Sequence, residues 1–294
     1  MNQGSLNSLF ARGEALLARV EALVPPVEAE VGWNDSTAFR WRKKGGRGYL
    51  HPVRHLASIR LGDLKNIDRQ KGLIDQNTRQ FVFGKPANNV LLTGARGTGK
   101  SSLIKACLIE YAERGLRLIE VDKADLVDLP DIVDLIAPRS ERFIVFCDDL
   151  SFEEGDGSYK SLKVALDGSV EAASENMLIY ATSNRRHLMP EHMRDNLSYK
   201  HLDDGAGNLE LHPGEGVEEK ISLSERFGVW LSFYPFKQDE YLDIVAQWLA
   251  HLGCDESSIA ASRADALRWA LERGSRSGRV AWQFARDWAG KHSQ

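Results

Sequence analysis

The sequence contains few cysteines, and they are too far apart to suggest a shared site. Only three occur among the 294 residues, Cys107, Cys147 and Cys254, and there is no C-x-x-C pair. A disulfide framework needs an even set of cysteines, and a zinc site needs closely spaced ligands, so the sequence argues against both. We interpret each cysteine as a small apolar residue of the core.

Long apolar runs are also absent. No stretch approaches the roughly 18 uninterrupted apolar residues of a membrane span. Residues 1–10 lack the basic start and apolar core of a signal peptide. With 43% hydrophobic and 27% charged residues and a formal net charge of -4, the composition is globular, without a general attraction for membranes or nucleic acids. We therefore expect a cytoplasmic protein that has no membrane partner.

Acidic residues are missing from residues 36–62, where arginines and lysines are interleaved with Phe39, Trp41 and Tyr49. Such a segment can follow a phosphate backbone while its rings stack on bases, which makes nucleic acid one candidate partner. Two other interpretations stay open. The segment is a solvated basic linker with a mobile loop at Gly45-Gly46, or it pairs with an acidic patch on a neighbouring subunit.

The sequence does contain a phosphate-binding loop. Residues 94–101 fit the pattern G-x-x-x-x-G-K-[ST] without a mismatch. The glycines let successive backbone N–H groups turn toward phosphate oxygens, and we expect Lys100 to reach the β- and γ-phosphates and Ser101 to ligate Mg²⁺. ATP and Mg²⁺ are therefore the predicted cofactors. The predicted nucleotide-binding residues of this loop are Gly94, Ala95, Arg96, Gly97, Thr98, Gly99, Lys100, Ser101 and Ser102.

Apolar strand patterns surround this loop and end in polar residues. Residues 143–147 lead into Asp148 and Asp149, and residues 177–181 lead toward Asn184. Parallel strands place their carboxyl ends at one edge of a sheet, so these side chains are expected beside the loop. Further strand patterns lie at residues 90–92, 116–121 and 229–233, whereas only helical patterns follow residue 236.

This order of parts resembles the AAA+ superfamily of P-loop ATPases. The strings at residues 86–90, 148–153, 181–188 and 275–279 look like a bacterial AAA+ family known as domain of unknown function 815. The resemblance implies an α/β fold with a parallel five-stranded sheet flanked by helices. It also implies three parts: residues 1–62 as an N-terminal helix (patterned over residues 4–24) and basic linker, residues 63–235 as the nucleotide-binding domain, and residues 236–294 as a small helical lid.

The resemblance assigns binding roles outside the loop. Ile67 and Asp68 match the N-linker, which lies against the adenine in AAA+ proteins. Asp148 matches the Walker B aspartate and would hold Mg²⁺ together with Ser101. Arg279 opens the last predicted helix, as the sensor 2 arginine does, and Arg276 is the alternative.

Catalytic roles follow from the same resemblance. Asn184 matches sensor 1, which positions the attacking water. Arg226 matches the arginine finger that reaches a neighbouring subunit's γ-phosphate, unless it is a structural arginine paired with a carboxylate. Asp149 stands where most AAA+ proteins have a glutamate, one methylene longer, so Glu153 stays open as the alternative base.

The function predicted from these parts is an ATPase that forms a homo-oligomer and hydrolyses ATP to ADP and phosphate at a subunit interface. Hydrolysis would drive conformational change or assembly, with the client protein unassigned. Three alternatives stay open: an ATP-dependent switch with negligible turnover, a nucleic-acid-associated motor or loader, and a P-loop kinase for a small metabolite. The kinase leaves the arginine finger and the helical lid unexplained.

Overall fold

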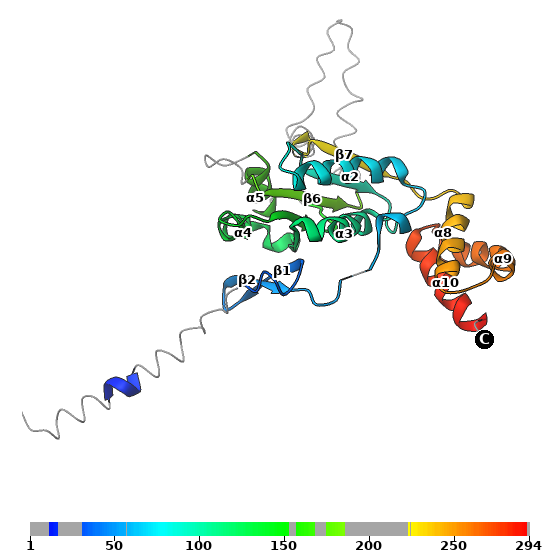
Figure 1. The fold of residues 1–294 in the computed structure, drawn as a ribbon, viewed down its shortest axis with the longest axis horizontal. Coiled ribbons are helices and arrows are strands. Elements are labelled where there is room, and N and C mark those ends of the chain that lie inside the picture. Colours follow the sequence, from blue (N-terminus) through cyan, green and yellow to red (C-terminus); the bar gives the residue numbers. More distant parts are fainter. Residues whose placement is uncertain are drawn as a thin grey trace, which may run out of the picture.

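The structure, a computed structural model, describes residues 12–16, 31–56, 58–152, 157–167, 175–185, 223 and 225–292. One sheet with helices on both faces forms its centre, and the helices that follow the last strand stand beside it (Figure 1). The strands are β1 (Ala38–Lys44), β2 (Arg47–Pro52), β3 (Val90–Gly94), β4 (Leu116–Glu120), β5 (Arg142–Cys147), β6 (Met177–Ser183) and β7 (Val229–Phe233). Besides a short helical segment within residues 12–16, the α-helices are α2 (Asp68–Val82), α3 (Lys100–Tyr111), α4 (Leu129–Ile136), α5 (Gly157–Asp167), α8 (Gln238–His251), α9 (Glu256–Glu272) and α10 (Gly278–His292). Short 3-10 helices are η1 (Leu61–Asp63), η2 (Ala112–Arg114) and η3 (Lys123–Asp128).

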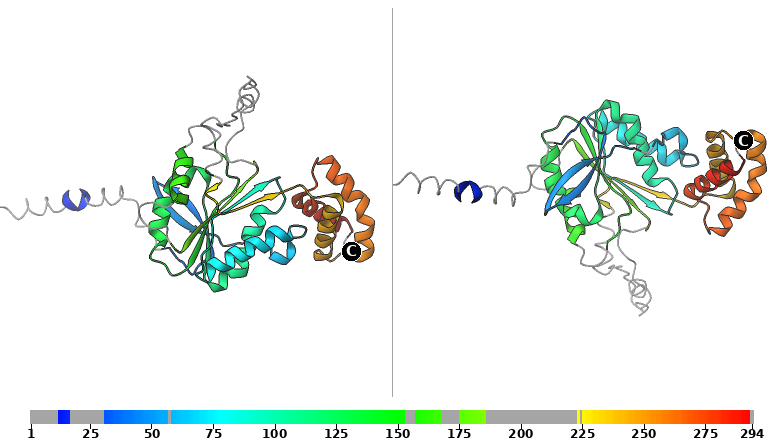
Figure 2. Two further views of the ribbon diagram at one scale, coloured as in Figure 1. Left: turned by 90° about the horizontal axis from the view of Figure 1, so that it is seen from above. Right: turned by 90° about the horizontal axis from the view of Figure 1, so that it is seen from below.

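The strand order of the sheet is β2-β1-β4-β5-β6-β3-β7, and every neighbouring pair is parallel except β1 and β2. Successive residues of a strand point to opposite faces. Leu92 and Ile144 pack in one apolar cluster with α2 and α3, whereas Leu91 and Val145 pack in a second cluster with α4 and α5. The central strands are thus apolar on both faces, as expected of parallel strands between two layers of helices (Figure 2).

The predicted number of five strands is corrected by the structure, because the sheet of the described residues has seven. Residues 38–52, which the sequence assigns to the basic linker, form the hairpin β1–β2, and β1 pairs in parallel with β4. Gly45 and Gly46 have φ values of 58° and 82°. A two-residue turn with both φ angles positive suits the twist of a hairpin, so these glycines make a tight turn.

The described chain after β7 is helical, which confirms the predicted C-terminal helical region. Apolar residues of α8, α9 and α10 belong to the same cluster as α2 and α3. Polar contacts also tie these helices to the segment after η1, since Gln247 Nε2 donates to the Asp63 carbonyl at 3.0 Å and Asn66 Nδ2 to the Glu240 carbonyl at 2.9 Å. Among the described residues, no helix has the length and apolarity to cross a membrane.

Candidate nucleotide-binding site

The loop between β3 and α3 has a backbone that only glycine fits well. Gly94, Gly97 and Gly99 have φ values of 127°, 73° and 98°. A Cβ on Gly94 would lie 1.9 Å from the Phe233 carbonyl oxygen, so an alanine there would separate β3 from β7. Gly99 directly precedes α3, and the helix therefore directs its N-terminal N–H groups, with their partial positive charge, at the loop.

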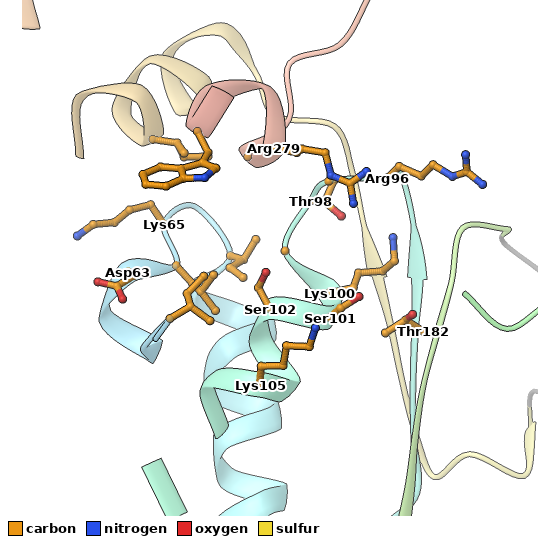
Figure 3. A pocket seen from close by; sticks show the side chains of 18 of the residues that line it. Asp63, Lys65, Arg96, Thr98, Lys100, Ser101, Ser102, Lys105, Thr182 and Arg279 are labelled. Carbon is orange, nitrogen blue, oxygen red and sulfur yellow. The ribbon is translucent and has the colours of Figure 1, made fainter. Parts of the chain in front are cut away.

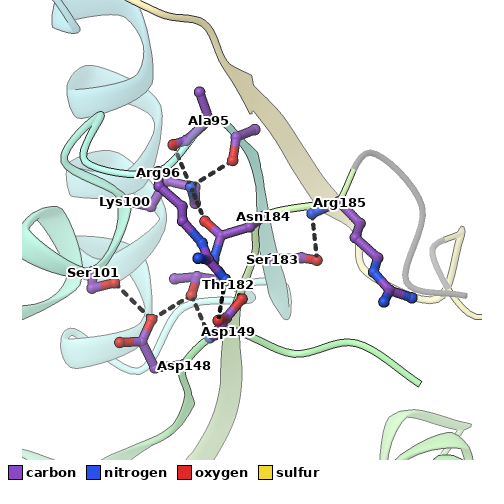
Figure 4. A network of polar contacts seen from close by, with 11 residues as sticks. Ala95, Arg96, Lys100, Ser101, Asp148, Asp149, Thr182, Ser183, Asn184 and Arg185 are labelled. Carbon is purple, nitrogen blue, oxygen red and sulfur yellow. Dashed lines mark hydrogen bonds and ion pairs between the residues drawn. The ribbon is translucent and has the colours of Figure 1, made fainter. Parts of the chain in front are cut away.

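Lys100 is buried beneath this loop. Its Nζ donates to the carbonyl oxygens of Gly94 at 2.7 Å and Ala95 at 2.8 Å, and to Asn184 Oδ1 at 3.2 Å (Figure 4). Burial lowers the pKa of Lys100, while the carboxylates at positions 148 and 149 act in the opposite direction. The ammonium group is thus held by neutral oxygens at the place where phosphate oxygens, which are stronger acceptors for a cation, would lie.

Ser101 and Asp148 form the part of the site that could hold a metal ion. Ser101 Oγ donates to Asp148 Oδ1 at 2.6 Å, and Thr182 Oγ1 donates to the same oxygen at 2.5 Å. Mg²⁺ prefers oxygen ligands and is commonly held by one or two protein oxygens together with phosphates and water. The residues present fit that ion. Among the described residues, no group of three or more His, Cys, Asp or Glu side chains offers an all-protein metal cage.

Asp149 is held in a conformation that is unusual for a residue with a side chain. Its φ is 53°, and its backbone N–H donates to Thr182 Oγ1 at 3.0 Å. Asn184 Nδ2 donates to Asp149 Oδ1 at 2.5 Å, and Arg96 Nη2 lies 3.6 Å from Asp149 Oδ2. Non-glycine residues in this region cluster at functional sites, where neighbouring contacts hold them. The carboxylate therefore points at the loop (Figure 4).

These groups line one end of a cavity of about 840 Å³. Its lining includes five lysines and arginines but only three aspartates, so it favours an anionic ligand. The lining cations are Lys65, Arg96, Lys100, Lys105 and Arg279. Figure 3 shows that they come from the segment between η1 and α2, the loop, α3 and the start of α10.

The other end of the cavity is apolar and aromatic. Leu64 and Ile67 line it from the segment before α2, and Trp248 and Trp282 line it from α8 and α10. The rings of the two tryptophans have centroids 4.6 Å apart. Sequence reasoning missed both tryptophans, because their spacing along the helices is that of ordinary core residues. Such a surface suits the planar base of a nucleotide whose phosphates lie at the loop.

The start of α10 contacts the loop directly. Gly278 N–H donates to the Gly97 carbonyl at 2.8 Å, and a Cβ on Gly97 would lie 2.8 Å from Ser277 Oγ. This contact brings Arg279 to the cavity. The alternative, Arg276, is exposed and does not line the cavity.

Among the described residues, four of the predicted site residues do not line the cavity: Gly94, Ala95, Asp68 and Arg226. The Asp68 side chain pairs with Lys71 Nζ at 2.9 Å, which lowers the pKa of Asp68, and it does not line the cavity. Arg226 lies just before β7 and also does not line the cavity of its own chain. Glu153 lies outside the described residues. In contrast, the buried Thr182, which joins Asp148 to the backbone of Asp149, was not predicted.

Comparisons with known proteins agree with this architecture. A family model described as "Protein of unknown function (DUF815)" matches residues 34–292. No curated protein matches the chain. A variant of RuvB from Thermotoga maritima is 16% identical to this chain, with a TM-score of 0.51. The match covers 78% of this chain and 64% of the RuvB chain. The ORC1 protein of Aeropyrum pernix, solved in complex with DNA, is also 16% identical, with a TM-score of 0.51. This match covers 79% of this chain and 62% of the ORC1 chain.

The chain thus spans less than two thirds of the length of these solved structures. At such low identity the likeness shows the fold alone. It confirms the predicted α/β fold, with a mostly parallel sheet flanked by helices and a helical region after the last strand.

Proposed function

Because the chain belongs to the DUF815 family of proteins of unknown function and has the fold of AAA+ ATPases, we propose its activity from the site itself: it binds MgATP and hydrolyses it to ADP and phosphate. The convergence of Lys100, the Ser101–Asp148 pair and the Asn184–Asp149 pair at one end of the cavity carries this proposal. A phosphate loop alone would support binding, whereas this convergence adds the groups that hydrolysis requires.

Binding begins with an exchange of partners at Lys100. The ammonium leaves the carbonyl oxygens of residues 94 and 95 and turns to the β- and γ-phosphates, while loop N–H groups donate to the remaining oxygens. Ser101 and Asp148 would hold Mg²⁺, which neutralises phosphate charge when it is bound. The aromatic end of the cavity, with Trp248 and Trp282, would receive the base.

Hydrolysis further requires a positioned water. Asn184 contacts both Lys100 and Asp149, so it stands between the phosphate-binding cation and the carboxylate. We assign to Asn184 the orientation of the attacking water and to Asp149 the acceptance of its proton. Glu153, which lies outside the described residues, stays the alternative acceptor.

The coupling of nucleotide state to movement is assigned to the lid, residues 236–294. Arg279 and the Gly278–Gly97 hydrogen bond connect α10 to the loop, so a change in the phosphates changes the contacts that set the lid angle. In a homo-oligomer, Arg226 would reach the γ-phosphate of a neighbouring subunit. Its position outside the cavity of its own chain is what a finger acting between subunits requires.

A second candidate, an ATP-binding switch with negligible turnover, rests on one observation. Both carboxylate oxygens of Asp149 are already engaged, one by Asn184 and the other by Arg96. If these contacts persist with nucleotide bound, they hold the carboxylate toward Asn184 and Arg96 and compete with the attacking water for its lone pairs. The chain would then bind ATP and change conformation without hydrolysing it.

Calorimetric titration with MgATP, combined with a phosphate-release assay, separates these candidates. For the ATPase, we expect Lys100→Ala to lose binding by about a hundredfold, since it removes a charge-assisted contact. Asp149→Asn should keep binding but lose most of the turnover. Tight binding with no turnover in the wild-type chain would favour the switch, and absence of ATP binding would overturn both.

A further inference from the structure

The hairpin β1–β2 presents a strongly basic surface that the nucleotide site does not use. In its register, Arg42 lies opposite Tyr49, Lys44 opposite Arg47, and Arg40 opposite His51. Directly opposed residues share a face of the sheet, and so do residues two positions apart on one strand. These six side chains therefore lie on one face of the hairpin, which is called the basic face below.

The opposite face of the hairpin fixes its orientation. Phe39, Trp41 and Leu50 are buried in the cluster that contains α4 and α5. The Trp41 ring covers Gly48, where a Cβ would lie 1.9 Å from the ring, and Trp41 Nε1 donates to Asp128 Oδ2 at 2.8 Å. The hairpin is thus attached to the core through its apolar face, and the basic face is the other side of the hairpin.

The cations of the hairpin fall into two groups. Arg40 pairs with Glu120 at 2.7 Å, and Lys43, on the other face, pairs with Asp128 at 2.8 Å. These ion pairs attach the hairpin to its neighbours. Arg42, Lys44 and Arg47, in contrast, are exposed and form no ion pair with any described residue.

The exposed cations are placed where they weaken the hairpin. Lys44 and Arg47 lie directly opposite each other, and like charges in that position destabilise a strand pair. Residues 36–62 contain no Asp or Glu that could relieve the repulsion locally. A bound polyanion would remove it, because each phosphate can neutralise one cation.

We propose that the basic face binds the phosphate backbone of single-stranded nucleic acid. Alternate residues of a strand lie roughly 6.8 Å apart, so Arg42 and Lys44 can contact separate phosphates while Arg47 contacts the chain from β2. Tyr49 lies half-buried among them, with a ring that can stack on a base. Stacking needs an unpaired base, which a single strand offers and a duplex does not.

The test is binding of a fluorescently labelled oligothymidylate of about 20 nucleotides to the full chain, measured by anisotropy as the salt concentration is raised. The variant combines Arg42→Gln, Lys44→Gln and Arg47→Gln. A matched control combines Arg263→Gln, Arg268→Gln and Lys291→Gln, three exposed cations of the helical region, so that both variants lose the same charge.

Each lost phosphate contact should reduce the slope of log K against log salt by roughly 0.7. We therefore expect the slope to become shallower by about 2 in the hairpin variant, which loses three contacts, and to stay unchanged in the control. Affinity at about 0.1 M salt should then fall about a hundredfold. Tyr49→Leu should lose about tenfold with no change of slope, because stacking is not ionic, whereas Tyr49→Phe should bind like the wild type.

Several outcomes would overturn the proposal: no binding at low salt, equal loss in the control, or tighter binding to a duplex of the same length. Equal or tighter binding to polyglutamate or to anionic phospholipid vesicles would assign the face to an acidic protein or a membrane instead. Calorimetric binding of MgATP checks the folding of each variant, since the basic face does not line the nucleotide cavity. If the triple variant does not fold, the comparison of Tyr49→Leu with Tyr49→Phe tests the proposal instead, and equal binding by these two variants would overturn it.

Discussion

Thr182→Val removes one hydroxyl group from the buried end of β6 and leaves the shape of the side chain nearly unchanged. That hydroxyl donates to Asp148 Oδ1 at 2.5 Å and accepts from the Asp149 N–H at 3.0 Å. A hydrogen bond to a charged group is worth about 1.5–3 kcal/mol, and Asp148 is exposed, so its bond belongs at the low end of that range. The unpaired N–H adds about 1 kcal/mol. We expect the variant to lose about 2.5 kcal/mol of stability.

Urea denaturation followed by circular dichroism measures this loss, with Thr182→Ser as the control that keeps the hydroxyl. The same substitution frees Asp148 from one of its two donors, and therefore weakens the group that would hold Mg²⁺. ATP affinity should fall about tenfold with Mg²⁺ present and much less in EDTA. A valine variant as stable as the wild type, with an unchanged Mg²⁺ effect, would refute the view that Thr182 organises the two aspartates.

Further predictions concern other parts of the chain. Gly94→Ala should destabilise the chain by roughly 2 kcal/mol or more, because the new side chain would be strained at a positive φ and would collide with β7. Urea denaturation tests this, and an unchanged stability would contradict the close approach of the two strands. At pH 8, Ellman's reagent should modify Cys254 rapidly and the other two cysteines only on unfolding. Burial raises the pKa of both those thiols to about 12, so about one molecule in ten thousand carries the thiolate; three fast thiols would contradict their burial. MgATP should change the intrinsic fluorescence of the wild-type chain, and Trp248→Phe combined with Trp282→Phe should abolish that change; a persisting change would place the base elsewhere.

The candidate nucleotide site could be predicted to the extent that its signals are local. The loop from Gly94 to Ser101 is a contiguous pattern, and Asp148 and Asn184 follow apolar strands that parallel pairing brings to the same sheet edge. Their contacts with Ser101 and Lys100 agree with that reasoning.

What could not be predicted depends on contacts between distant segments. The contacts of Thr182 with the two aspartates depend on β6 lying beside β5. The positions of Trp248 and Trp282 at the cavity depend on how α8 and α10 pack near the segment before α2. No pattern in a single sequence reports such contacts.

The basic hairpin was misinterpreted for a different reason. Its alternation of Phe39 and Trp41 with arginines, followed by Gly45-Gly46, is a strand and turn signal that the abundance of charge obscured. The composition indicates a linker, whereas the period of two indicates a strand with one buried face.

The most direct test of the central claim measures phosphate release per chain, at saturating MgATP, as the protein concentration is raised. A site that hydrolyses MgATP and is completed by Arg226 of a neighbouring subunit predicts that the specific rate climbs with concentration and then levels off. Arg226→Ala should remove the climb without removing ATP binding. The claim is contradicted if the wild-type chain binds ATP but releases phosphate no faster than Asp149→Asn at every protein concentration.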